Sequence, residues 1–339
     1  MRYLILLFFI FCSWMVRAQQ TAQYTQYMMN RYLYNPAFAG FEDHGEVKTG
    51  FRQQWTGLNS SISSFYLTGH MALDKPDLTS TGYRLNRSKS IRRPYELTKT
   101  RPNTMRPDPH QGLGIQILGD QFGPLTNISI GGTYAYHLTL GGEKKLSVGT
   151  TIGLHQRILN LGGLDVKDPN DPNITNGKLL GSQPLINVGG MYYTRDLYIG
   201  IAANQLIMDN YSLLRTNITD KDTIRTMWLG ATVPNILLSA GFQKKLNQYW
   251  EIAPSIMVKY MKNATLSYEA NIKATYTNTL WGGISYRHQE AIAALIGAQI
   301  SERVNVTYSY EVHSLGLSRT SLGSHELVLG ILLENFFEK

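Results

Sequence analysis

The stretch Asn127-Ile-Ser-Ile-Gly-Gly-Thr-Tyr-Ala-Tyr-His-Leu138 alternates between two kinds of side chain. Its even positions carry most of the larger apolar and aromatic residues, such as Ile130 and Tyr134, and its odd positions carry polar or small ones. A period of two places these sets on opposite faces of a β-strand. Residues 266–276 and 304–313 show the same alternation, so the sequence predicts an all-β protein.

Two architectures have strands with one polar face: a soluble β-sandwich and a transmembrane barrel with a polar lumen. The alternating segments are about ten residues long, which is the length a tilted strand needs to cross a bilayer, whereas sandwich strands are shorter. Aromatic residues stand at segment ends, where the girdles of a membrane barrel lie; they include Trp250, Tyr260, Tyr276 and Trp281. We therefore predict a transmembrane antiparallel β-barrel.

Counting the segments gives about fourteen strands, an even number, as single-chain bacterial barrels require. Their predicted starts are residues 46, 61, 112, 127, 145, 186, 197, 235, 249, 266, 280, 290, 304 and 324.

The composition excludes two other classes of protein, polytopic helical membrane proteins and disulfide-stabilised proteins. The chain has 339 residues, one cysteine and a mean hydropathy of −0.20. No apolar run after the first residues reaches the length of a membrane helix, which excludes a polytopic helical protein, and one cysteine excludes an internal disulfide framework. A modest mean hydropathy is expected when strands alternate between lipid and a polar lumen.

The first eighteen residues read as a secretory signal peptide. A positive start, the apolar run 4–11 and the small-x-small site ending at Ala18 have the required order. Cys12 would leave with this segment, and bulky Phe11 argues against a lipoprotein site. We expect residues 1–18 to be cleaved, residues 19–44 to form an N-terminal segment and residues 45–339 to form the barrel, located in the cell outer membrane.

The connections suggest which end of the barrel faces the periplasm, because short turns face that side in such barrels. The compact turns predicted there are 141–144, 194–196, 244–248, 277–279 and 301–303. The long connections 157–185 and 205–234 then lie outside. One long insert, about 74–111, lies on the periplasmic side.

This insert holds the net charge of the mature chain. Residues 81–110 contain eight Lys and Arg against two acidic residues, a net charge of +6, and the rest of the mature chain is balanced. One interpretation is a flexible, solvated insert without a binding role. The other is a segment that docks to an acidic periplasmic partner. The arginines proposed for that contact are Arg84, Arg87, Arg92, Arg93 and Arg101.

Several blocks resemble the PorP/SprF family of type IX secretion proteins of Bacteroidetes. The mature N-terminus supplies Gln26-Tyr27-Met28-x-Asn30 and Asn35-Pro36-Ala37-Phe38-Ala39-Gly40, and later blocks follow in the family's order. Those later blocks are 52–55, 113–114, 120–124, 134–137, 146–149, 254–255 and 324–326. The resemblance covers nearly the whole mature chain except the basic insert.

The resemblance implies a non-enzymatic outer-membrane component of the type IX secretion and gliding machinery. Family members serve secretion or surface anchoring of particular cargo proteins, often adhesins with a C-terminal sorting domain. Some contact a periplasmic, peptidoglycan-binding OmpA-like partner. The expected partners are therefore such a cargo, the periplasmic protein, other type IX components and membrane lipid, without nucleic acid. The alternative function is a porin or a transport barrel for hydrophobic substrates.

The N-terminal segment has an apolar helical face that needs cover. Asn35-Pro36 would end any helical turn, since the residue before proline is pushed out of the helical region, and Gly40 would permit a turn into the first strand. The segment is expected either to plug the lumen or to lie at the periplasmic rim as a partner epitope. The candidate contact residues are Gln26, Tyr27, Asn30, Asn35 and Pro36.

The sequence contains few signs of metal or catalytic chemistry. The loop carrying Asp165, Asp168, Asn170 and Asp171 crowds oxygen ligands as a calcium site does, but it lacks the glycine and terminal glutamate of an EF-hand loop. A rigid Asx-Pro turn explains it equally. Zincin, phosphate-loop and nucleophile-elbow motifs are absent. We expect no cofactor, and no enzyme.

Overall fold

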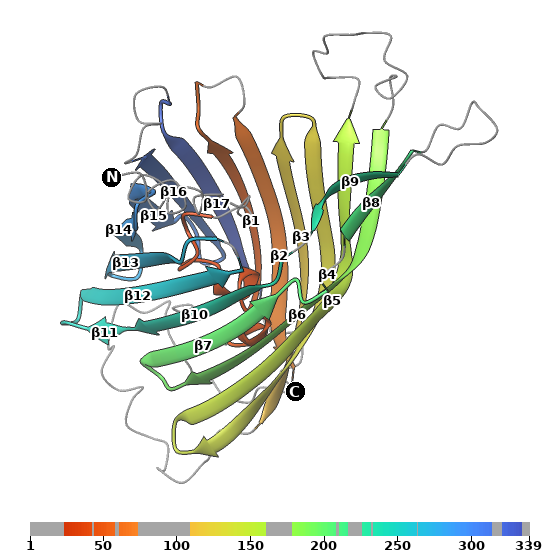
Figure 1. The fold of residues 1–339 in the computed structure, drawn as a ribbon. Helices are drawn as coiled ribbons and strands as arrows, with labels where there is room; N and C mark the ends of the chain where they lie inside the picture. Colours follow the sequence, from red (N-terminus) through yellow and green to blue (C-terminus); the bar gives the residue numbers. More distant parts are fainter. Residues whose placement is uncertain are drawn as a thin grey trace, which may run out of the picture.

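The computed structural model describes residues 24–42, 44–57, 61–73, 109–160, 178–207, 210–215, 226–231, 233–262, 264–313 and 321–333. These residues form one antiparallel sheet of seventeen strands. The sheet closes on itself, because β1 (Gly45–Gln54) pairs with both β2 (Ile62–Leu73) and β17 (Ser324–Leu333). Closure leaves no edge strand in the barrel wall (Figure 1).

Fourteen strands form the closed wall. Besides β1, β2 and β17 they are β3 (His110–Phe122), β4 (Leu125–Gly141), β5 (Lys144–Asn160), β6 (Lys178–Tyr193), β7 (Leu197–Asn204), β10 (Asn235–Phe242), β12 (Trp250–Met261), β13 (Ser267–Tyr276), β14 (Leu280–Arg287), β15 (Ala291–Gln299) and β16 (Val304–His313). The remaining three are β8 (Asn210–Arg215), β9 (Thr226–Ala231) and the two-residue β11 (Lys244–Lys245). The predicted barrel of about fourteen strands is confirmed.

The alternation read from the sequence sets which face each residue occupies. In β4 the odd positions from Ser129 to His137 are buried and the even positions from Ile130 to Leu138 are exposed. β13 and β16 follow the same rule. The exposed set over the whole wall is rich in Ile, Leu, Val, Phe and Tyr, which is the surface a barrel presents to lipid.

Most predicted strand starts lie within two residues of the observed ones, but β6 begins at Lys178 rather than at residue 186. Residues 157–185 were expected to form a connection. Pro184 in this stretch cannot donate a hydrogen bond to a ladder. In the structure Pro184 pairs with Leu154 of β5. On its other side β6 pairs with β8 only at Leu179 and Leu180, and with β7 only from Val188 onward. Pro184 is tolerated because, on that side, β6 has no ladder pairing between Leu180 and Val188.

The connection 205–234 was also expected to be a loop, and it holds the hairpin β8–β9. This hairpin lies beside the start of β6, where β8 pairs with Leu179 and Leu180 (Figure 1).

We call one end of the barrel the short-turn end. It carries the turns 142–143, 194–196, 277–279 and 300–303, together with the start of β1 and the end of β17. The opposite end carries the long connections 161–177 and 205–234, together with the short turns 123–124 and 288–290.

Two short 3-10 helices precede the barrel, η1 (Arg31–Leu33) and η2 (Pro36–Phe38). Among the described residues no helix has the length and hydrophobicity required to span a membrane. The N-terminal segment, here residues 24–42, lies inside the barrel (Figure 1), and nearly all of it is buried. Of the two predicted positions for this segment, plug or rim, the structure has the plug.

Candidate functional site

The N-terminal segment passes through the lumen from one half to the other. Thr25 contacts Glu311 and Glu326. Glu311 lies near the end of β16 and Glu326 near the start of β17, and both positions are away from the short-turn end. The carbonyl of Ala39 accepts a hydrogen bond from His137, near the short-turn end of β4. The candidate site is therefore the lumen, with this segment as its plug.

Thr25 attaches the first part of the plug to buried charged groups. Its backbone N–H donates to Oε2 of Glu326 at 2.7 Å, and its hydroxyl donates to Oε2 of Glu311 at 2.8 Å. Arg52 donates to the same hydroxyl. The neighbouring Gln26 donates to Ser309 and to the carbonyl of Glu326. Charge-assisted bonds of this kind are stronger than neutral ones.

The charged groups around Thr25 form an ion-pair network in the lumen. The guanidinium of Arg52 lies 3.0 Å from Glu311 and 3.4 Å from Glu326. Arg287 lies 3.0 Å from Glu269 and 3.5 Å from Glu311. We call these five residues the luminal ion cluster. All five are almost fully buried, so their desolvation has to be compensated by one another.

Aromatic residues occupy the middle of the plug. Tyr32 donates to Thr133 of β4 at 2.6 Å, and Tyr24 packs edge-on against Tyr66 at 4.9 Å between ring centroids. Tyr27 packs against Leu237 and other buried residues of β7, β10 and β12. Burial raises the pKa of the Tyr32 hydroxyl to about 12, so it stays a neutral donor. Apolar burial of these rings stabilises the plug in the lumen.

Asn35 shapes the second half of the plug, and glycines make room for it. Its side-chain oxygen caps η2 by accepting from Ala37 N–H at 2.9 Å, with Pro36 in the first helical position. Its amide also donates to the carbonyls of Gly190 and Ile201. The plug backbone lies against two inward-facing strand residues without side chains, Gly112 and Gly149, and the side chain of Asn35 lies against a third, Gly189.

Two strand side chains hold the plug backbone at the short-turn end. His137 lies 2.8 Å from the carbonyl of Ala39, and Ser147 donates to the carbonyl of Ala37 at 2.8 Å. A carbonyl only accepts, so Nε2 of His137 carries the proton and its Nδ1 accepts from Tyr193. Gly40 then turns the chain toward β1 with a φ of +74°, as predicted.

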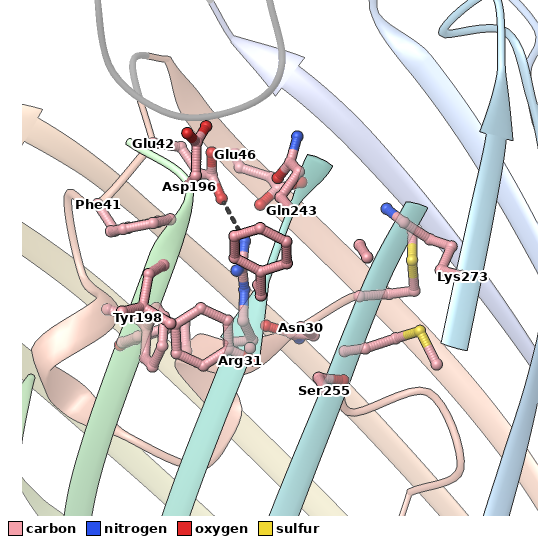
Figure 2. A pocket seen from close by; sticks show the side chains of 18 of the residues that line it. Asn30, Arg31, Phe41, Glu42, Glu46, Asp196, Tyr198, Gln243, Ser255 and Lys273 are labelled. Carbon is pink, nitrogen blue, oxygen red and sulfur yellow. Dashed lines mark hydrogen bonds and ion pairs between the residues drawn. The ribbon is translucent and has the colours of Figure 1, made fainter. Parts of the chain in front are cut away.

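A cavity of about 80 Å³ lies between the plug and the wall at the short-turn end (Figure 2). Arg31 lies at its centre, with its guanidinium carbon 5.0–5.4 Å from the ring centroids of Phe38, Phe41 and Tyr198. Glu42 pairs with Arg31 at 3.0 Å. The wall on the far side contributes Lys273, Gln243 and Ser255 among others.

Several polar and charged groups around this cavity bond to one another. Lys48 lies 2.7 Å from Glu46, and Gln243 donates to Glu251 at 2.6 Å. No group of three metal-ligating side chains occurs among the described residues. On β17 the neighbouring residues Glu326 and His325 face opposite sides of the barrel wall. Glu326 faces the lumen, and His325 bonds to Tyr308 on the outer surface. The cavity lining thus combines charged, polar and aromatic side chains around Arg31.

The sequence-predicted contact residues divide into two groups. Gln26, Tyr27, Asn30, Asn35 and Pro36 lie inside the lumen and are buried there. Their role in partner binding stays a prediction. The insert arginines Arg84, Arg87, Arg92, Arg93 and Arg101 and the calcium candidates Asp165, Asp168, Asn170 and Asp171 lie outside the described residues.

Sequence reasoning did not identify the luminal ion cluster. The alternation places Glu269 and Glu311 on the polar face of their strands, but not beside Arg287 and Arg52. Their proximity depends on the register between strands, which pairs Glu269 with Arg287 directly. One signal was available: Arg52 and Glu326 belong to the blocks that carry the family resemblance.

These features define a class, a transmembrane β-barrel whose lumen is occupied by its own N-terminal segment. The family described as type IX secretion system membrane protein PorP/SprF matches residues 16–331. The chain belongs to this family, and it is an outer-membrane protein. No curated protein matches the chain significantly.

Solved structures of similar fold come from outer-membrane proteins. They include a Pseudomonas aeruginosa FadL homologue, 10% identical, with a TM-score of 0.48 over 88% of this chain and 92% of that one. The Ralstonia pickettii toluene transporter TbuX is 12% identical, with a TM-score of 0.45 over 92% and 94% of the two chains. The Acinetobacter baumannii outer membrane protein Omp33 is 7% identical, with a TM-score of 0.46 over 87% and 100%.

Proposed function

We propose that this chain is a non-enzymatic component of the type IX secretion and gliding machinery. In this proposal it binds, anchors or supports the surface display of particular cargo proteins and contacts periplasmic partners. The observation that carries the proposal is the lumen occupied by the plug in a member of the PorP/SprF family. A barrel filled by its own chain is suited to binding proteins at its two ends.

The two ends of the barrel offer different surfaces. Short turns face the periplasm in barrels of this kind, and longer loops face outward, so we assign the short-turn end to the periplasm. The outer end then carries the connections 161–177 and 205–234, the latter with the hairpin β8–β9. We propose that these connections hold the exported cargo, which carries a C-terminal sorting domain.

The periplasmic end offers the cavity around Arg31 and the basic insert. The insert joins β2 to β3, and His70 near the end of β2 lines the cavity. An OmpA-like, peptidoglycan-binding protein is the proposed partner at this end. Its contact would combine the net charge of +6 in residues 81–110 with the mixed-charge lining of the cavity, and would weaken as salt is added.

Deleting the gene tests the cargo role. We expect one or a few specific proteins to disappear from the cell surface while general type IX export continues, as measured by surface proteomics of mutant, parent and complemented strains. Identical surface proteomes in mutant and parent strains would refute the proposal.

Trimming residues 81–110 to a short turn tests the periplasmic role separately. We expect the trimmed barrel to fold, as judged by its heat-modifiable migration in gels, but to recover less periplasmic protein in a pull-down from membranes. Equal recovery of periplasmic protein by the trimmed and the full-length protein would show that the insert does not take part in the contact. A variant that keeps the insert length but replaces its arginines by glutamine separates charge from length.

The alternative is a transport barrel. The plug counts against free diffusion through the lumen, because residues 24–42 fill the space that a porin leaves open. A steady open conductance of the purified, intact protein in planar bilayers would favour the transport function over the proposed one.

A further inference from the structure

Two tyrosine–histidine groups stand on the outer surface of the barrel, away from the lumen. In the first, the ring of His288 stacks on Tyr268 with centroids 4.3 Å apart, and its Nδ1 lies 3.2 Å from the hydroxyl of Tyr286. In the second, Nδ1 of His325 lies 2.7 Å from the hydroxyl of Tyr308, and Tyr310 packs against the same ring. The same arrangement is thus built twice.

Both groups lie at the end of the barrel that we assign to the cell surface. Tyr268 is near the start of β13, His288 is in the turn after β14, and His325 is near the start of β17. The wall is low here, since β13 to β17 have 8–10 residues while β4 and β5 have 17. A strand of nine to eleven residues spans the hydrocarbon layer, so these ends lie level with the lipid headgroups.

Both groups are polar, and neither contains a lysine, an arginine or a carboxylate. The other outward-facing residues of β13 to β17 are Ala, Gly, Val, Ile, Leu and Tyr, without Lys, Arg, Asp or Glu. Each Tyr–His pair offers an outward hydrogen-bond donor in either imidazole tautomer. If the tyrosine hydroxyl donates to Nδ1, then Nε2–H remains free to donate to a ligand. If Nδ1–H donates to the tyrosine oxygen instead, the tyrosine hydroxyl remains free to donate to a ligand. No described residue bonds Nε2 of either histidine.

From this combination we propose that the face formed by β13 to β17 binds the sugar headgroup of an outer-leaflet glycolipid. Exposed aromatic rings supply flat apolar faces, and the hydrogen-bond donors match hydroxyl and ether oxygens. A site for a bare phosphate would instead need lysine or arginine, and this face has none. The proposal uses the location in the outer membrane but is independent of the proposed cargo role.

The test compares lipids bound to barrels in nanodiscs. Wild-type protein is reconstituted with equal amounts of lipopolysaccharide and phosphatidylglycerol, and the lipids that remain bound are counted by native mass spectrometry. The variant His288→Phe/His325→Phe keeps the rings and removes the histidine nitrogens. Tyr260→Phe is the matched control, because Tyr260 is an exposed tyrosine near the same end of β12 with no histidine partner.

We expect the wild type and Tyr260→Phe to retain lipopolysaccharide in preference to phosphatidylglycerol, and the double variant to lose at least five-fold of that preference. His288→Gln/His325→Gln, which restores a donor, should recover part of it. Heat-modifiable migration confirms that each variant is folded. Equal retention of both lipids by the wild type, or an unchanged preference in the double phenylalanine variant, would overturn the proposal. The groups would then be an ordinary interfacial aromatic belt.

Discussion

The α-carbon of Gly112 faces the carbonyl oxygen of Ala39 so closely that a Cβ on Gly112 would overlap that oxygen. Gly112 belongs to β3 and Ala39 to the plug. A Cβ on Gly149 would likewise lie 2.5 Å from the carbonyl oxygen of Pro36. The plug backbone is therefore seated directly on the backbone of the wall, and side chains there would displace it.

Gly112→Ala tests this seat. We expect the barrel to close normally and the plug to shift, because the clash is with backbone that has no rotamer to change. Trypsin then gains access to the bond after Arg31, which lies in the plug, and the N-terminal fragment released by cleavage should appear several-fold faster in mass spectra.

Gly132→Ala is the matched control for that experiment. Gly132 lies on the exposed face of β4, and a Cβ there meets nothing within 4 Å. Its cleavage after Arg31 should equal that of the wild type. Equal cleavage in Gly112→Ala as well would mean that the plug does not depend on this seat.

Arg52→Met tests the luminal ion cluster. The substitution leaves Glu311 and Glu326 buried without the guanidinium that faces both of them. Removing one partner of a buried ion pair costs about 3–5 kcal/mol. We expect that loss in the free energy of unfolding, measured by urea titration of the barrel folded into lipid vesicles.

The triple variant Arg52→Met/Glu311→Gln/Glu326→Gln separates charge from packing. It removes the stranded carboxylates, so we expect it to recover much of the stability lost in Arg52→Met. No recovery would show that Arg52 acts through its packing contacts rather than its charge.

Alkaline pH should release the plug before it unfolds the barrel. Burial raises the pKa of Tyr32 to about 12, and it also raises the pKa of Tyr24, Tyr27 and Tyr34. A tyrosine that ionises at about pH 10 in the free chain therefore binds its proton more tightly in the folded plug. This stabilisation is complete below pH 10 and falls by about 1.4 kcal/mol per pH unit and per group above it.

The measurement is the absorbance of tyrosinate at 295 nm, followed together with trypsin cleavage after Arg31. Cleavage should begin above about pH 10 while heat-modifiable migration of the barrel persists. Tyr32→Phe removes one ionisable hydroxyl, so its cleavage should begin at higher pH. Cleavage that begins instead on acidification would contradict the assignment to these tyrosines.

Much of the barrel was predictable because its signal is local. A period of two is visible within single segments such as 127–138, and it fixes the face of every residue without knowledge of the partners. The sequence predicted a plug or a periplasmic rim for the N-terminal segment but could not choose between them, because the choice depends on contacts such as Thr25 with Glu311, which are 286 residues apart in sequence. The same applies to the extent of β6, where Pro184 is permitted only by the missing neighbour on one side.

Removing residues 24–42 should convert the closed barrel into a conducting one. The plug buries inward-facing polar groups such as Thr68 and Thr133 through its own hydrogen bonds, and without it water would hydrate them. We expect small or no conductance for the intact protein in planar bilayers and steady open currents for the deletion variant. Trimming the insert 81–110, which connects β2 to β3 and leaves residues 24–42 intact, serves as the control. The conductance of the trimmed protein should match that of the intact protein. Equal currents from the intact and the plug-deleted barrels would show that the plug leaves an open path through the lumen. That result would favour the transport function over the proposed one.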